Sequence, residues 1–333
     1  DFLKKQKMEI ENILISFIAL FNFLLIIFFD KIKLFKINID KPDGKRKLHE
    51  NPIPLAGGTI IFLNLIIYFL LIFNNPTLFK DEIIFKIEEN LILFFIISIS
   101  IFILGFLDDK LNISATMKFI TITLLVTFIL ILDETLNIKI IKFSFIDKEF
   151  YLSDYSIIFT CFCFLVFLNA FNMFDGINLQ SGIYSIIIFL SVILVYSDLF
   201  IAKVILISVL TFSFLNFKNK LFLGDSGSLL VAFLIGYIFI KLYNYEIISF
   251  TDEVVLYMLL PGIDLIRLFF KRIYLKRNPL TPDRFHLHHL LISRYSYKKS
   301  LIIISLLILL PIVMNFFGIS KFIIILLFVL IYL

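Results

Sequence analysis

The sequence predicts an all-α, polytopic integral membrane protein with about eleven transmembrane helices, and three observations support this prediction. Hydrophobic residues make up 60% of the 333 residues and charged residues only 17%, whereas soluble globular chains are about one-half apolar and one-quarter charged. Phenylalanine alone occurs 43 times, and the mean hydropathy is +1.02. Apolar runs of roughly the 17–25 residues that a helix needs to cross a bilayer recur along the chain. A soluble domain is therefore excluded.

The apolar runs give the predicted transmembrane helices in chain order. They lie near residues 13–29, 53–73, 91–107, 118–132, 156–172, 181–197, 200–217, 227–244, 253–270, 299–317 and 320–333. The first run lacks the small-residue cleavage site of a signal peptide, so we interpret it as a span. Residues 138–153 alternate imperfectly between apolar and polar side chains, which predicts a small external β-hairpin. No fixed-period repeat is visible, so we expect a single integral-membrane domain over residues 1–333.

The basic residues predict how the chain is oriented. Alternating crossings place five polar loops on one side, near residues 30–58, 105–118, 169–182, 216–228 and 271–298, and most loop lysines and arginines fall there. Because loops rich in Lys and Arg stay in the cytoplasm, we expect the N-terminus outside and the C-terminus in the cytoplasm. Membrane topology then explains the net charge of +5, and no nucleic-acid partner is expected.

The polar residues gather on the same side, because all four histidines and the densest acid and amide clusters lie in or beside these loops. Ionisable groups at membrane depth are costly unless they serve a site, so we expect one polar site at the cytoplasmic boundary. Its first element is DKPDGKRKLHENPIPLAGG, residues 40–58, which carries Arg46, Lys47 and His49. These cations either anchor the chain at the membrane surface or bind an anion that enters the site. The histidine and the Gly57-Gly58 pair, which permits close backbone approach, favour anion binding.

The second element is LGFLDDKLN, which sets Asp108 and Asp109 at the end of an apolar helix. Paired carboxylates suit a divalent cation, or one of them can orient or deprotonate an attacking group. The alternative is a solvated helix-end pair beside Lys110. Adjacent positions do not share a helix face, so we expect one Asp to point into the site and the other to support it.

The third element is NAFNMFDGINLQSG, in which Asn169, Asn172 and Asp175 form a polar stripe that Asn178 follows. Such groups are costly in hydrocarbon without partners, although Asp175 could simply cap a helix. Their amides and carboxylate have the chemistry to recognise a nucleobase, a ribose or an N-acetyl group.

The fourth element is NKLFLGDSGSLL, in which Asp225 lies between two glycines at the expected start of a helix. A helix N-terminus favours phosphate, and a carboxylate beside it can ligate a phosphate-bound Mg²⁺. A plain helix N-cap is the alternative. The spacing of a Walker loop is absent.

The fifth element is NPLTPDRFHLHHLL, where Thr281-Pro282-Asp283 predicts a helix start. If the helix continues, His286 and His289 share one face, and Arg284 and His288 share another. Contact with phosphate or sugar is favoured over a zinc site or an inert surface cluster, because no Cys accompanies the histidines. Upstream, Asp264 and Arg267 form either a structural ion pair or a substrate contact.

Taken together and in this order, DKPDGKRKLHENPIPLAGG, LGFLDDK, NAFNMFDGIN, FLGDSGS and PDRFHLHH resemble the polyprenyl-phosphate N-acetylhexosamine-1-phosphate transferases, glycosyltransferase family 4, the superfamily of MraY and WecA. The resemblance spans about residues 40–290. The last motif is similar to that of the WecA and TagO-type branch, not to that of the phospho-MurNAc-pentapeptide transferases. Leu179 and Gln180 depart from the family, which often has Gly and Leu there.

The resemblance implies transfer of an N-acetylhexosamine-1-phosphate from a UDP-sugar such as UDP-GlcNAc to undecaprenyl phosphate, with release of UMP. It implies Mg²⁺, for which Mn²⁺ could substitute, held by Asp225 and Asp108. Asp108 would act on the lipid phosphate, with Asp109 as its support or as a second group of the metal site. The substrate-binding residues that it implies are Arg46, Lys47, His49, Asn169, Asn172, Asp175, Asn178, Phe222, Arg284, His286, His288 and His289.

The implied setting is the bacterial plasma membrane, with the active site on the cytoplasmic face and the lipid bilayer as a partner. The product would enter cell-envelope polysaccharide synthesis, and a homodimer stays open. Two alternatives remain, a phospho-MurNAc-pentapeptide transferase and a transporter for an anionic solute. Transporters commonly place their sites at the midplane between internal repeats, and neither feature is visible here.

Overall fold

The computed structural model describes residues 2–42, 51–75, 82–85, 87–276 and 285–332. The chain forms two compact units. Unit 1 comprises Asp1–Ile113 and Ser185–Leu230, and unit 2 comprises Ser114–Tyr184 and Val231–Leu333.

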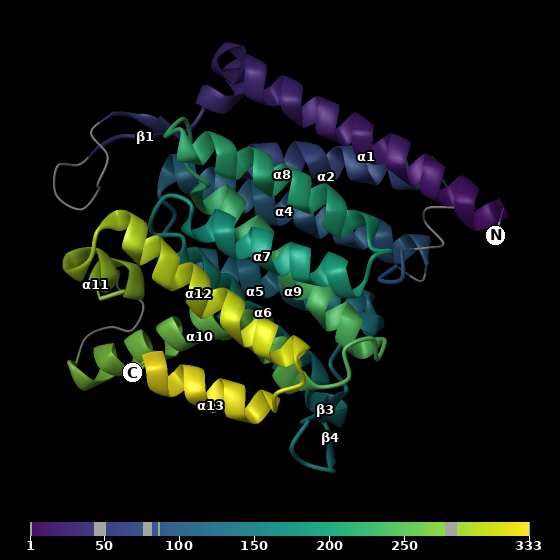
Figure 1. Cartoon of the computed structure of the whole chain (residues 1–333), viewed down its shortest axis with the longest axis vertical. Helices are drawn as coiled ribbons and strands as arrows, with labels where there is room; N and C mark the ends of the chain where they lie inside the picture. Colours follow the sequence, from purple (N-terminus) through teal and green to yellow (C-terminus); the bar gives the residue numbers. More distant parts are fainter. Residues whose placement is uncertain (1, 43–50, 76–81, 86, 277–284, 333) are drawn as a thin grey trace. The chain divides into compact units, whose positions relative to one another are not determined.

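Unit 1 is built from helices that pack along one another. Its elements are α1 (Phe2–Phe28), η1 (Phe29–Lys31), η2 (Lys33–Lys36), β1 (Ile39–Asp40), β2 (Ile53–Pro54), α2 (Gly57–Phe73), α4 (Glu88–Leu111), most of α7 (Gln180–Val195), α8 (Phe200–Phe217) and the first turns of α9 (Gly224–Asn244). Both α1 and α2 lie beside α8 (Figure 1). Reciprocal amide hydrogen bonds of 2.6 and 3.1 Å join Asn22 of α1 to Asn64 of α2, so this buried contact has no unpaired amide.

A buried acid fixes the start of α8 in unit 1. The backbone N–H of Ile201 donates to Oε1 of Glu82 at 2.8 Å, which satisfies one of the N–H groups that a helix start leaves unpaired. Glu82 is 1% exposed, and burial raises the pKa of its carboxyl to about 8.

In unit 2, helix α10 contacts α6, α12 and α13. The elements of this unit are α5 (Ala115–Leu132), η3 (Glu134–Leu136), β3 (Ile140–Lys142), β4 (Glu149–Tyr151), η4 (Ser153–Tyr155), α6 (Ser156–Phe174), the rest of α9, α10 (Thr251–Tyr274), α11 (Leu287–Arg294), α12 (Tyr297–Phe316) and α13 (Lys321–Tyr332). Helix α6 packs against α5 and α10, while α12 and α13 lie along α10 (Figure 1). Leu256 and Leu259 of α10 pack with Ile324 and Phe328 of α13.

The predicted fold class is confirmed to the extent that the described chain is mostly helical and contains several candidate membrane spans. Each of the eleven apolar runs coincides with a helix in the described part of the chain. Seven helices there are long and apolar enough to cross a membrane, and α2, α7 and α13 are apolar but shorter. Helix α10 is outside both groups, since acids and bases interrupt its 24 residues. Eleven crossings, with their orientation, therefore stay a prediction.

The predicted hairpin is confirmed as a structure. Strands β3 and β4 pair antiparallel, with Ile141 opposite Phe150 and Lys142 opposite Glu149. An ion pair of 2.9 Å between Lys142 and Glu149 links the strands. The hairpin is anchored by Ser144, whose backbone N–H donates to Asp252 Oδ1 of α10 at 3.1 Å. Its external position stays a prediction.

A buried ion pair joins α9 to the end of α5 within unit 2. Lys241 Nζ lies 2.6 Å from Asp133 Oδ2, and the two side chains are 0% and 1% exposed. Asp133 also accepts a hydrogen bond from the backbone N–H of Thr135 at 3.1 Å, which starts η3. The charge of each residue is thus compensated without solvent.

Candidate functional site

The N-terminus of α9 in unit 1, called the helix mouth below, is capped by the Asp109 carboxylate of α4. The N–H groups of Asp225 and Ser226 donate to Asp109 Oδ1 and Oδ2 at 2.7 and 3.1 Å. These are first-turn N–H groups that α9 itself cannot satisfy, and the helix dipole favours a negative charge there. Asp109 therefore supports the helix start that carries Asp225.

Glycines make this approach sterically possible. Gly224 has φ +75°, and a Cβ on it would lie 2.7 Å from Asp109 Oδ2. A Cβ on Gly105, one turn earlier in α4, would lie 2.5 Å from Ser226 Cα. On α2, a Cβ at Gly58 would overlap the backbone N of Gly227. Helices α2, α4 and α9 thus meet backbone to backbone in unit 1.

The segment that leads into α2 runs along the segment that leads into α9. Phe222 N–H donates to the Pro54 carbonyl at 2.8 Å, and Gly57 N–H donates back to the Phe222 carbonyl at 3.0 Å. The first and fourth sequence elements are therefore adjacent in unit 1. The predicted binding residues Arg46, Lys47 and His49 lie outside the described residues.

Asp108 turns away from its neighbour, as adjacent helical positions predict. Its Oδ1 accepts from the N–H of Ile113 at 2.8 Å, which closes the left-handed turn at Asn112, where φ is 52°. Asp108 is 6% exposed. A solvated helix-end pair is the wrong description, because Asp108 is buried and both carboxylates are bound to backbone N–H groups.

The donor set at α9 fits Mg²⁺ better than zinc. Mg²⁺ is commonly held by one or two carboxylates together with substrate phosphates, and Asp225 and Asp109 are the carboxylates at this helix mouth. Structural or catalytic zinc needs three or four protein ligands. Across the described residues, no group of three or more His, Cys, Asp or Glu is arranged to hold a metal.

The third element lies at the C-terminal end of α6 in unit 2. Asp175 is the C-cap residue, and its N–H donates to the Phe171 carbonyl at 3.1 Å. Its Oδ1 also accepts from Ser181 Oγ at 2.5 Å, so capping is only part of its role. Asn169 Nδ2 donates to the Leu165 carbonyl one turn earlier at 2.7 Å. Nothing in the sequence singled out Ser181.

The third and fifth elements meet within unit 2. A Cβ on Gly176 would overlap Cε1 and Nε2 of His288, so the imidazole lies directly against this turn. Beside it, Tyr297 Oη donates to the Asn178 carbonyl at 2.5 Å. Asn172 and Asn178 are half-buried. The glycine is the sequence signal for this contact, whereas Tyr297 carried none.

The expected helix register of the histidines is wrong. Helix α11 begins at Leu287, and His286 is its extended N-cap residue with φ −60° and ψ 152°. His286 and His289 therefore share no helix face. The rings of His286 and His288 stack at 5.5 Å with an interplanar angle of 7°. Arg284 lies outside the described residues.

His288 is a neutral histidine. It is 2% exposed, and burial, followed by the neighbouring His289 and His286, lowers its pKa to about 3. Its Nδ1 has no hydrogen-bond partner among the residues that the structure describes. An inert surface cluster is therefore the wrong description of this residue.

Asp264 and Arg267 form an ion pair of 2.9 Å in α10, as one of the two sequence interpretations predicts. Asp264 Oδ2 also lies 2.9 Å from Nδ1 of His286. The pair thus contacts the fifth element directly, which the sequence did not reveal.

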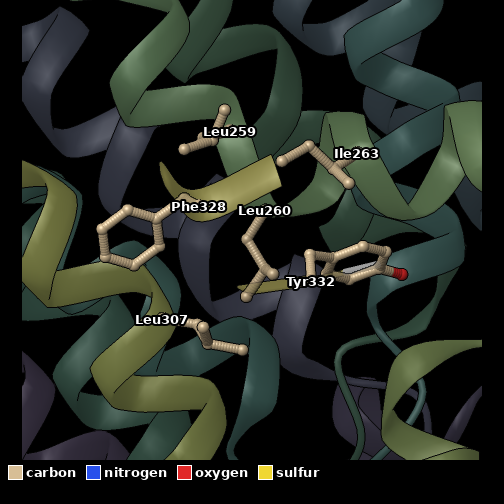
Figure 2. Close-up of a pocket in the computed structure, with 6 residues that line it drawn as sticks. All are labelled: Leu259, Leu260, Ile263, Leu307, Phe328 and Tyr332. Atoms are coloured by element: carbon tan, nitrogen blue, oxygen red, sulfur yellow. The ribbon is translucent and has the colours of Figure 1, made fainter. Parts of the chain in front are cut away.

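A small pocket in unit 2 is not a substrate site. Figure 2 shows its six lining residues, which come from α10, α12 and α13. Its volume is about 10 Å³, which is about the space of one water molecule. Five of the six lining residues are Leu, Ile or Phe. The sixth is Tyr332, whose phenol oxygen points away from Leu307 and Phe328 (Figure 2).

Comparisons with known proteins agree with the five motifs. The model of glycosyl transferase family 4 matches residues 91–243. Among curated proteins, the chain is similar to undecaprenyl-phosphate alpha-N-acetylglucosaminyl 1-phosphate transferases. The one from Salmonella typhi is 25% identical over 90% of this chain and 82% of its own length. Those of Escherichia coli K12 and Thermotoga maritima are 24% and 29% identical, over 87% and 85% of this chain and 78% and 81% of theirs.

The family match covers the segment that holds the second, third and fourth elements. The similarity to the curated enzymes extends over 85–90% of the chain. Both comparisons therefore support the resemblance of this chain to the polyprenyl-phosphate N-acetylhexosamine-1-phosphate transferases of glycosyl transferase family 4, on the WecA-like branch.

Proposed function

We propose that this protein transfers N-acetylglucosamine-1-phosphate from UDP-N-acetylglucosamine to undecaprenyl phosphate. An oxygen of the lipid phosphate bonds to the sugar-bearing phosphorus of the donor. The bond from that phosphorus to the bridging oxygen breaks, and UMP leaves with the electron pair. The proposal rests on the similarity to enzymes of this name over 85–90% of the chain.

One observation in the structure supports the proposal most directly, the seating of Asp109 on the first N–H groups of α9. Both reactants are anions, so the protein must lower their repulsion before proximity can help. With Asp109 as the cap, the side chain of Asp225 is not required for that task. Asp225 therefore stands beside the capping carboxylate at the start of α9, where a ligand would meet the helix N-terminus.

Asp225 is the residue that would hold Mg²⁺, and Asp108 is the second candidate. The cation would neutralise charge on the donor diphosphate. Asp109 positions Asp225 through the backbone of α9. Asp108 would orient the lipid phosphate, and its bond to Ile113 N–H fixes its carboxylate for that role.

The remaining predicted residues bind the donor. Asn172, Asp175 and Asn178 would recognise uridine and sugar through amide and carboxylate groups, and Asn169 would support them. Phe222, held by backbone bonds to residues 54–57, would stack on the base. The predicted phosphate and sugar contacts are Arg46, Lys47, His49, Arg284, His286, His288 and His289.

The apolar helices and the relatives support a multi-pass protein of a bacterial membrane. We propose that it resides in the plasma membrane with its site on the cytoplasmic face, where UDP-sugars are made. Both units carry motif residues, so we propose that the chain works as one transferase domain that starts an envelope polysaccharide.

The test is an assay of UMP release and lipid product with UDP-N-acetylglucosamine, undecaprenyl phosphate and Mg²⁺. Asp225→Asn should lower the rate more than 100-fold, which corresponds to about 2.7 kcal/mol, while the protein still accumulates in membranes. The matched control is Asp30→Asn, an exposed acid of unit 1 paired with Lys220 at 2.5 Å. It should stay within twofold of wild type. Activity of Asp225→Asn within tenfold of wild type would exclude the metal role.

The same assay decides the donor. UDP-N-acetylglucosamine and UDP-MurNAc-pentapeptide are offered at equal concentration, and the lipid products are separated. We expect the product without peptide. A preference for the pentapeptide donor would contradict the proposal and assign the chain to peptidoglycan synthesis.

A further inference from the structure

The carboxylate of Asp264 is shared between His286 and three other donors. Its Oδ2 lies 2.9 Å from His286 Nδ1. Its Oδ1 accepts from Arg267 Nη2 at 2.9 Å and from the backbone N–H of Leu287 at 3.2 Å. The hydroxyl of Tyr332 in α13 donates to the same oxygen. One oxygen is therefore saturated, and the other faces the imidazole.

The backbone on both sides of His286 is held by the same ion pair. Arg267 Nη2 donates to the Phe285 carbonyl at 2.5 Å, and its Nε donates to Tyr332 Oη at 2.9 Å. Leu287 on the other side is held by Asp264. The side chain of His286 and its two flanking residues are thus fixed from α10.

This arrangement determines which ring nitrogen can meet a ligand. A carboxylate accepts hydrogen bonds, so Nδ1 of His286 carries a proton in either charge state. Nε2 is the remaining polar atom, and it has no hydrogen-bond partner within the described ranges 2–42, 51–75, 82–85, 87–276 and 285–332. Arg267 already balances the charge of Asp264, so a protonated His286 leaves a net positive charge for an anion.

We propose that Asp264 is a positioning residue that holds His286 so that the ring, when it carries both protons, donates from Nε2–H to a phosphate oxygen of the anionic donor. Asp264 itself does not touch the substrate. This inference rests on the proposed function for the identity of the anion. It does not rest on that function for the state of the imidazole ring, which can be measured separately.

The substitution Asp264→Asn should change which nitrogen of His286 carries the proton. Three donors surround Oδ1, so the amide that replaces the carboxylate would keep its oxygen there and direct its NH₂ group at His286. Nδ1 would then have to accept a hydrogen bond, and the ring proton would move to Nε2. The ring could no longer carry both protons. An aspartate-to-asparagine change beside a catalytic histidine has this effect in serine proteases.

The kinetic experiment separates positioning from a purely structural role. We expect Asp264→Asn to raise KM for the UDP-sugar about tenfold or more, the order expected for a lost hydrogen bond to a charged group. Asp264→Glu should recover part of this loss. The control is Asp252→Asn, a buried acid of the same helix that anchors the hairpin. It should lower the amount of active enzyme with KM unchanged, as a structural role predicts. An unchanged KM in Asp264→Asn would overturn the inference.

A double-mutant cycle tests whether Asp264 acts through His286. Once His286→Ala has removed the ring, adding Asp264→Asn should not raise KM further. Independent, multiplying effects of the two substitutions would overturn the inference.

The final experiment does not need activity. Ring-¹⁵N histidine NMR of the whole chain in detergent reports which nitrogen carries the proton, and four histidines can be assigned by single substitutions. In wild type we expect the neutral His286 ring to carry its proton on Nδ1, and in Asp264→Asn on Nε2. A wild-type proton on Nε2 overturns the inference, even if Asp264→Asn fails to fold. An inactive wild type with the proton on Nδ1 would reject the proposed function and retain the positioning.

Discussion

Gly176, in the turn after α6, has no side chain and therefore leaves room for the ring of His288. Because a Cβ there would overlap the imidazole, Gly176→Ala must displace the ring or the turn. Overpacking of this kind typically costs about 1–3 kcal/mol, and we expect transfer activity to fall at least tenfold.

Gly262→Ala is the matched control for this substitution. A Cβ on Gly262 in α10 meets nothing within 4 Å, so the variant should retain wild-type activity. Equal activity of the two variants would show that the close contact between Gly176 and His288 is not needed for transfer.

His288 also makes stability depend on pH. Its folded pKa is about 3, against 6.5 for an ordinary histidine. Between pH 6.5 and pH 3 the unfolded chain therefore binds a proton that the folded chain does not, and stability falls as the pH falls. The thermal midpoint in detergent should drop between pH 7 and pH 4.5, and less steeply in His288→Gln. If the thermal midpoint fell equally steeply with pH in wild type and in His288→Gln, the lowered pKa of His288 would be contradicted.

At the scale of elements, the ion pair between Lys241 and Asp133 gives a stability prediction. Lys241→Met leaves the Asp133 charge buried without its partner, which typically costs about 3–5 kcal/mol. The midpoint of denaturant unfolding in detergent should fall accordingly. The double variant Lys241→Met with Asp133→Asn removes both charges and should recover most of the loss. A change below about 1 kcal/mol in the single variant would show that the pair adds no stability.

The elements themselves were largely predictable from hydropathy. Helix α8 occupies residues 200–217 as expected, and α6 ends two residues beyond the predicted 156–172. The start of α11 was not predictable, because His286 is held extended by a carboxylate 22 positions earlier in the chain. Periodicity describes a helix face but cannot anticipate a long-range bond that delays the helix start.

At the scale of the whole molecule, the orientation is the untested prediction. In a chain with Cys161 and Cys163 replaced, a membrane-impermeant thiol reagent applied from outside should modify Lys148→Cys and spare Ser293→Cys. Both positions are exposed, so protection would reflect the side of the membrane and not burial. The reverse pattern would contradict a site that uses cytoplasmic UDP-sugar.

The candidate site was predictable as a set of residues but not as contacts. Five motifs in order identified the acids and histidines. The bond between Asp109 and Asp225, however, spans 116 positions, and no local pattern encodes which of two adjacent aspartates makes it. The contact of Asp264 with His286 was not predictable for the same reason. Its sequence neighbours explain an ion pair with Arg267, and only the folded chain brings His286 to its other oxygen.

The glycine contacts of unit 1 have a consequence for biogenesis. Gly58 and Gly105 are synthesised early, but their backbone partners Ser226 and Gly227 follow Gly105 by roughly 120 residues. At about 5–20 residues per second, ribosomes need about 6–24 s to reach them. During that time α2 and α4 remain in the bilayer with a bare glycine surface, which favours helix association. The nascent chain therefore completes this contact only after α9 has been made, and until then the glycine surfaces of α2 and α4 are open to other helices.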